Sequence, residues 1–194
     1  MPNWVINKIT ISGKNVKERI EPLLTLYTGN DKPQFDFEKL IPCPKELTET
    51  EESTRTPDSV YANNIKKYGF KSWYDWRCHN WGCKWNACDT EIFELTDTYA
   101  DIEFQTPWNA MGFTLFTLIC FKFSDCEITL EYADEDCGSN TGWYSYDSIN
   151  KEPTEFRNVN CSKEAYETYI KCWGQPEELV YNEKINNYEW VYED

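Results

Sequence analysis

The sequence has one histidine, His79, and this scarcity limits the chemistry that we expect of it. A cysteine–histidine nucleophile pair would have to use His79, and general-base work would otherwise fall to a carboxylate that no motif distinguishes. The chain also lacks a Gly-rich phosphate loop, a Gly-x-Ser-x-Gly elbow and a paired-metal pattern. We therefore expect a protein that is not an enzyme, with His79 packed or hydrogen-bonded.

Long apolar runs are missing too. A membrane helix needs about 20 apolar residues, whereas the longest candidate, around residues 113–123, is short and interrupted by threonine and lysine. The start, MPNWVINKITIS, has no basic region followed by an unbroken apolar region, and the nine cysteines are odd in number and irregularly spaced. These features predict a cytoplasmic protein with reduced thiols and no membrane contact.

A metal site is the next possibility to weigh, because Cys78, His79, Cys83 and Cys88 are ligand types that zinc accepts. Zinc knuckles place their ligands two to four residues apart, but these cysteines are five apart. On a helix that spacing turns successive thiols by about 140°. We expect buried thiols and no metal or other cofactor, with zinc left open if the segment is a loop.

Basic residues are scarce in the second part of the chain. Residues 1–124 hold 17 acidic and 14 basic residues, whereas residues 125–194 hold 17 acidic and 5 basic, a net charge of −12 out of −15. Such a surface repels nucleic acid and anionic membranes, and it favours a basic partner. Solubility alone is the simpler interpretation.

The sequence is rich in tryptophan, and WYDWRCHNWGCKWN at residues 73–86 holds four of the nine. Indole rings bury large areas and need an acceptor for the N–H group. The stretch therefore predicts a structural aromatic layer, with each indole N–H bonded. Its members are Trp73, Trp76, Trp81 and Trp85.

Apolar periodicity predicts an antiparallel sheet combined with helices. Strands are expected at 4–11, 35–41, 92–95, 100–104, 126–132 and 143–146. Helices are expected from residue 15 to about 27, at 59–70, after Thr106-Pro107, and at 162–173, with an exposed loop at 46–58. This order predicts an α+β fold with helices packed on one face of the sheet.

Several motifs in this order resemble a known family. They are MPNW with an asparagine three residues later, FDFEKLIPCPKEL, WYDWRCHNWGCKWN, and FQTPW. Together, over residues 1 to about 146, they resemble the phage- and plasmid-borne YubB-like family with a ferredoxin-like domain. The resemblance implies a ferredoxin-like sheet and a mobile-element origin, and it implies no activity. We expect a ferredoxin-like domain at 1–146 and an acidic, aromatic-rich extension at 147–194.

The acidic part interleaves carboxylates with aromatic residues, as a protein that occupies a nucleic-acid channel would need. We hypothesise a protein that binds, and inhibits, a basic host protein such as a nucleic-acid-processing nuclease or a defence effector. Its expected contacts are Asp134, Glu135, Asp136, Trp143, Tyr144, Tyr146, Trp190 and Tyr192. A zinc- or small-ligand-binding module and an unrecognised small enzyme are the alternatives. A solvated, partly disordered acidic tail would explain the same composition.

Overall fold

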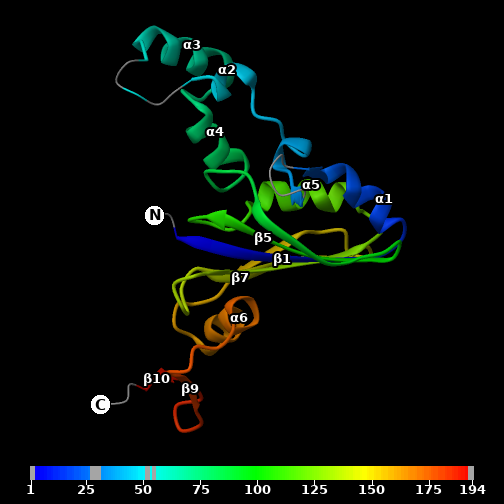
Figure 1. The fold of residues 1–194 in the computed structure, drawn as a ribbon, viewed down its shortest axis with the longest axis vertical. Helices are drawn as coiled ribbons and strands as arrows, with labels where there is room; N and C mark the ends of the chain where they lie inside the picture. The colour runs from blue at the N-terminus through cyan, green and yellow to red at the C-terminus, as the bar shows by residue number, and fades with distance from the viewer. Residues whose placement is uncertain (1–2, 27–31, 51–52, 54–55, 192–194) are drawn as a thin grey trace.

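The computed structural model describes residues 3–26, 32–50, 53 and 56–191. Its framework is a six-stranded antiparallel sheet with the strand order β4-β5-β1-β6-β7-β8 (Figure 1). The strands are β1 (Trp4–Ser12), β4 (Cys88–Leu95), β5 (Tyr99–Pro107), β6 (Glu127–Asp134), β7 (Thr141–Tyr146) and β8 (Thr154–Arg157).

The first four strands of this sheet form a ferredoxin-like unit. In chain order the elements are β1, the helix α1 (Val16–Ile20), β4, β5, the helix α5 (Phe113–Lys122) and β6. Strand β1 lies between β5 and β6, where its β-branched residues suit a central position. The predicted α+β fold with a ferredoxin-like antiparallel sheet is therefore confirmed.

The two faces of the sheet have different coverings. Helices α1 and α5 pack on one face, called here the core face, and their buried residues join those of the strands in the main hydrophobic core. Helix α6 (Lys163–Trp173) packs on the opposite, outer face, where Cys172 contacts Ile6 and Ala133 (Figure 1). The prediction of helices on one face concerned residues 1–146, where α1 and α5 agree with it, whereas α6 belongs to the expected extension and covers the other face. The amphipathic helix was recognised, but its side of the sheet depends on Ile6 and Ala133, which point away from the core.

A long insertion connects α1 to β4. It folds as a two-stranded sheet and short helices, and α2 and α3 lie at its far end from the main sheet (Figure 1). Its elements are η1 (Glu21–Leu23), β2 (Leu24–Leu26), β3 (Pro33–Phe35), η2 (Phe37–Lys39), α2 (Lys45–Thr48), α3 (Asp58–Tyr68) and α4 (Trp73–Asn80). Gly69 ends α3 with a φ of 79°, a left-handed conformation that glycine adopts without strain.

Three predicted elements differ from those observed. The helix expected at residues 15–27 ends at Ile20, next to the 3-10 turn that holds Pro22, and residue 27 lies outside the described residues. The strand expected at 35–41 stops at Phe35, because the Asp36 side chain caps a 3-10 turn. The loop expected at 46–58 contains most of α2.

The predicted helix start at Thr106-Pro107 is wrong. Strand β5 continues to Pro107, and α5 begins at Phe113 after Gly112. The Thr106 hydroxyl cannot cap a helix there, because it accepts a hydrogen bond from Asn7 Nδ2 at 2.8 Å and donates one to the Asn109 carbonyl at 2.7 Å. These two hydrogen bonds of Thr106 instead fix the loop between β5 and α5.

The C-terminal part of the chain adds to the sheet. The boundary expected at residue 146 falls between β7 and β8, which pair with each other in the sheet. Ser162 caps α6 as expected, accepting from the Ala165 N–H group, and a hairpin of β9 (Leu179–Asn182) and β10 (Asn187–Trp190) follows. Among the described residues, every helix is too short or too polar to cross a bilayer.

Candidate functional site

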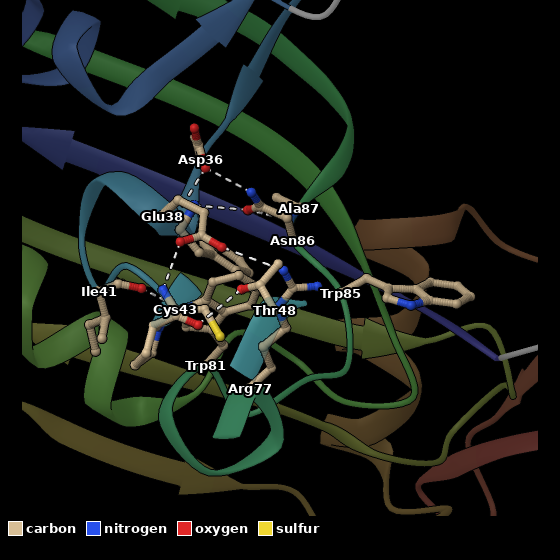
Figure 2. A network of polar contacts seen from close by, with 12 residues as sticks. Asp36, Glu38, Ile41, Cys43, Thr48, Arg77, Trp81, Trp85, Asn86 and Ala87 are labelled. Atoms are coloured by element: carbon tan, nitrogen blue, oxygen red, sulfur yellow. Dashed lines mark hydrogen bonds and ion pairs between the residues drawn. The ribbon is translucent and has the colours of Figure 1, made fainter. Parts of the chain in front are cut away.

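The tryptophan-rich stretch forms α4 and the turn after it. Ser72 caps α4, and Trp81 follows its end with no exposed surface. The Trp81 indole donates to the Ile41 carbonyl at 2.9 Å, and the Arg77 guanidinium lies 4.7 Å from the centre of the Trp81 ring. This stretch is therefore fastened to the segment FDFEKLIPCPKEL (Figure 2).

Polar side chains complete the junction between these two motifs (Figure 2). Glu38 accepts from the Cys43 N–H group at 2.7 Å and pairs with Arg77 at 3.4 Å. Asn86 accepts from the Phe37 N–H group at 2.8 Å and donates to Asp36 at 2.7 Å. The observed contacts of both motifs thus hold the insertion together, which is a structural role.

The structure separates the four tryptophans expected to form one layer. Trp76 and Trp81 are buried with their rings 5.8 Å apart and nearly perpendicular, and Trp73 packs against the edge of the core. Trp85 is not part of the buried layer, since it is 38% exposed and lies beside Trp4 at the surface. The chain turns at Gly82, and that change of direction carries Trp85 outward.

The candidate zinc ligands do not converge. Among the residues that the structure describes, no group of three or more histidine, cysteine, aspartate or glutamate side chains could hold a metal ion. All nine cysteines are described and are free thiols. Burial raises the pKa of Cys83, and it raises the pKa of Cys88 to about 11. His79 is exposed and packs on the Phe70 ring at 5.2 Å.

The expected acidic contact Asp134 is an internal residue. It is 5% exposed, and its carboxylate accepts hydrogen bonds from Asn3, from Asn140 and from the Asp136 N–H group, at 3.3, 3.1 and 2.9 Å. Its charge thus holds the β6–β7 turn, so Asp134 is not available to a partner. Glu135 and Asp136 are exposed.

The expected aromatic contacts also divide between the faces. Tyr144 and Tyr146 belong to the hydrophobic core, because alternate residues of β7 point to opposite faces. Trp143 points to the outer face, where its ring stacks on Phe156 at 5.6 Å. Trp190, on the C-terminal hairpin, is partly exposed, and Tyr192 lies outside the described residues.

The outer face carries acidic side chains that the sequence reasoning missed. Strands β4 and β5 place Glu91 opposite Glu103 and Glu94 opposite Asp101. Net charge over residues 1–124 concealed these carboxylates, because lysines and arginines elsewhere balance them. The alternating pattern of residues 100–104 could have revealed them, since alternate residues of a strand share a face.

Among the described residues, the ion pairs that compensate the acidic charge of this face lie near α6. There Lys8 pairs with Glu103 at 3.1 Å, and Lys171 pairs with Glu131 at 2.6 Å. Farther from α6, Glu94 and Asp101 form no ion pair within the described part of the chain. Burial raises the pKa of Tyr99, and the carboxylates of Asp101 and Glu94 raise it further.

A groove extends this acidic surface across β6 and β7. It encloses about 390 Å³, and its acidic lining residues are Glu127, Asp147 and Glu152. Its floor contains the hydroxyls of Thr129, Ser145 and Thr154. We refer to Glu91, Glu94, Asp101, Glu103 and Glu127, together with the stacked rings of Trp143 and Phe156, as the acidic face.

The order of the strands, with α5 between β5 and β6, can be compared with that of known proteins. Residues 80–171 match the family model "Ferredoxin-like domain in Api92-like protein". No curated protein matches the chain. The crystal structure of protein Api92 from Yersinia pseudotuberculosis is similar over 82% of this chain and 99% of that chain, with 9% identity and a TM-score of 0.44.

The Api92-like match concerns the fold. Its range begins at the end of α4 and runs through β8 into α6, so it includes the strands that carry the acidic face. The similarity to the Api92 crystal structure is too low to support a functional comparison. The phage or plasmid origin implied by the sequence resemblance stays a prediction.

Proposed function

We propose that the protein is a non-enzymatic binding protein whose acidic face binds a basic protein partner. The observation that supports this most directly is the like-charge pair across β4 and β5 in which Glu94 faces Asp101, whereas in the second pair, Glu91 and Glu103, Lys8 offsets part of the charge. Like charges directly opposite each other destabilise a sheet. A positively charged partner would relieve that repulsion, and the relief would contribute to the free energy of binding.

The stacked rings provide the second part of the proposed interface. Trp143 and Phe156 stay partly exposed, although both are large and apolar. Aromatic residues are enriched in the buried centre of protein interfaces, and tryptophan is among the side chains that contribute most to binding. In this proposal the carboxylates attract the partner, and the rings hold it after contact.

A nucleic-acid-processing or defence protein has the required chemistry, because its binding channel presents lysine and arginine side chains to phosphate groups. The acidic face would occupy such a channel in place of nucleic acid, and would not bind nucleic acid itself. Inhibition of a host protein by the product of a phage or plasmid, in the cytoplasm, is the form of this proposal that the sequence resemblance favours.

A short oligolysine peptide provides a defined probe of the acidic face. We expect it to shift the amide resonances of β4, β5 and the Trp143 region in a saturable titration, more strongly at low salt. Screening acts over about 8 Å at physiological ionic strength, so raising the salt should weaken the association. The triple variant Glu91→Gln, Glu94→Gln, Asp101→Asn should lose most of the affinity.

The matched control neutralises the same number of carboxylates elsewhere. Glu18→Gln, Glu21→Gln and Glu49→Gln change exposed residues of α1, η1 and the end of α2, and this variant should bind like the parent protein. Equal losses in both variants would mean that only the net charge matters, and the acidic face would not be the site.

A partner captured from the native host and named by mass spectrometry allows a stricter test. The capture must fail with the triple variant and succeed with the control variant. Trp143→Ala should then raise the dissociation rate by an amount equivalent to about 2 kcal/mol, with little change in the association rate. Binding insensitive to salt and to both kinds of substitution would refute the proposal.

A further inference from the structure

A second concave site lies at the N-terminus of α5, away from the acidic face. It is a cavity of about 370 Å³ between the turn after α4, the start of α5 and strands β6 to β8. The residues that matter in it are His79, Phe113, Tyr132, Tyr144, Glu155 and Arg157.

The start of α5 is held in place by contacts from two of the sequence motifs. Asn7, which is fully buried, accepts from the Met111 N–H group at 2.8 Å, and the Gly112 N–H group donates to the Trp81 carbonyl at 2.7 Å. Gly82 packs directly on Gly112, so that a Cβ atom at Gly82 would lie 2.5 Å from the Gly112 Cα atom. The position of the helix end is therefore rigidly specified.

No side chain caps this helix end. The N-cap residue is Gly112, and the first bond within the helix joins the Phe116 N–H group to the Gly112 carbonyl. Gly112, Phe113 and Thr114 all line the cavity. The N–H groups of the first turn are thus open to it, with the positive end of the helix dipole behind them.

Two buried tyrosines supply a separate indication of a ligand. Tyr132 is 2% exposed and Tyr144 is 3% exposed, and both line the cavity. Their rings are buried, but neither hydroxyl is among the fully enclosed, unpartnered polar atoms of the described residues, so both oxygens face the cavity rather than the core. Burial raises the pKa of both groups, which keeps them protonated and able to donate.

Charged residues lie at the rim of the cavity. The Arg157 guanidinium pairs with Glu155 at 3.0 Å and leaves donors free for a second acceptor. Glu155 is the unfavourable residue for an anion, and its pairing with Arg157 offsets part of its charge. His79 and Phe113 provide ring surfaces on the opposite side.

We propose that this cavity binds a small molecule through an anionic group, a phosphoryl or a carboxylate, held by the first turn of α5, by the hydroxyls of Tyr132 and Tyr144, and by Arg157. The donors converge from separate elements, as an anion requires. The volume of the cavity suits a small molecule rather than a macromolecule.

Amide resonances of Phe113 and Thr114 give a direct readout. Sodium phosphate and sodium acetate are titrated separately against sodium chloride at constant ionic strength. We expect saturable shifts with at least one of the two anions, and the preferred one identifies a phosphoryl or a carboxylate group. Absence of any specific shift with both anions would overturn the proposal.

Single-atom variants test the hydroxyl groups. Tyr132→Phe and Tyr144→Phe should each weaken the binding of that anion about tenfold, the loss expected for one hydrogen bond to a charged group. Because the structure gives neither hydroxyl a hydrogen bond to another described residue, both variants should melt at about the temperature of the parent protein. Arg157→Gln should weaken binding, and Glu155→Gln should strengthen it.

The control is Tyr146→Phe, at a residue of β7 two positions after Tyr144. The Tyr146 hydroxyl donates to the Ser124 carbonyl at 3.0 Å and lies outside the cavity. This variant should lower stability and leave anion affinity unchanged. If it weakened binding as much as the other two tyrosine variants, or if those two bound like the parent, the hydroxyls would have no role in binding.

Discussion

The two faces of the main sheet differ in the side chains that they carry and in how completely those side chains are paired. On the core face, Val5, Ile9 and Ile11 of β1 are fully buried, and the one polar residue among them, Asn7, has every polar atom bonded. On the outer face of the same strand, Lys8 and Thr10 meet carboxylates and hydroxyls of neighbouring strands. The core face is built for stability, whereas the outer face keeps repulsive pairs that stability alone would remove.

The largest effect should come from the core face. Trp81→Ala removes a fully buried indole and leaves the Ile41 carbonyl without its donor, so we expect a loss of about 3–5 kcal/mol in the free energy of unfolding. Trp85→Ala, at the surface, should cost less than about 1 kcal/mol. Denaturant unfolding measures both. Equal losses would mean that Trp85 also belongs to the stabilising layer.

A second comparison uses adjacent residues of β1 that point to opposite faces. Asn7→Ala leaves the buried Met111 N–H group without its acceptor and removes the donor to the Thr106 hydroxyl, so we expect a loss of about 2–3 kcal/mol. Lys8→Ala removes a partly exposed ion pair with Glu103 and should cost less than about 1 kcal/mol. Thermal unfolding of both variants checks this order. A larger loss for Lys8→Ala would reverse the proposed division between the faces.

The smallest effect should have the opposite sign. Glu94→Gln, or Asp101→Asn, removes a like-charge pair across β4 and β5, so each should stabilise the protein by about 0.2–1 kcal/mol at low salt. The double variant should gain less than the sum of the two, because one substitution already relieves the repulsion. A double-mutant cycle followed by urea unfolding measures the coupling. Additive or destabilising changes would remove the main support for the acidic face.

Much of the fold could be predicted because local patterns and tertiary packing agree. The alternation in β1 and β6, the hairpin of β4 and β5, and the capped helix α6 were each expected near their observed bounds. The start of α5 could not be predicted locally. Thr106-Pro107 has the composition of a helix start, but Thr106 bonds to Asn7, which lies 99 residues away in the chain.

The candidate sites were less predictable than the fold. Composition indicated an acidic, aromatic surface in residues 125–194, yet Asp134, Tyr144 and Tyr146 are buried there. The carboxylates of the acidic face come largely from β4 and β5, and basic residues elsewhere in residues 1–124 hide them in a count of net charge. No sequence pattern predicted the cavity at the start of α5, although residues that hold this helix end belong to motifs that the sequence showed.

The sequence by itself determined five strands of the main sheet and the burial of Trp76 and Trp81, because periodicity and large apolar side chains act locally and strongly. Only the tertiary structure decided which face each strand residue meets, that α6 covers the outer face, and that Glu94 opposes Asp101. Register brings together side chains that are distant in the chain, and one residue of shift would exchange the two faces. For that reason, the fold could be predicted from the sequence and the candidate binding surfaces required the structure.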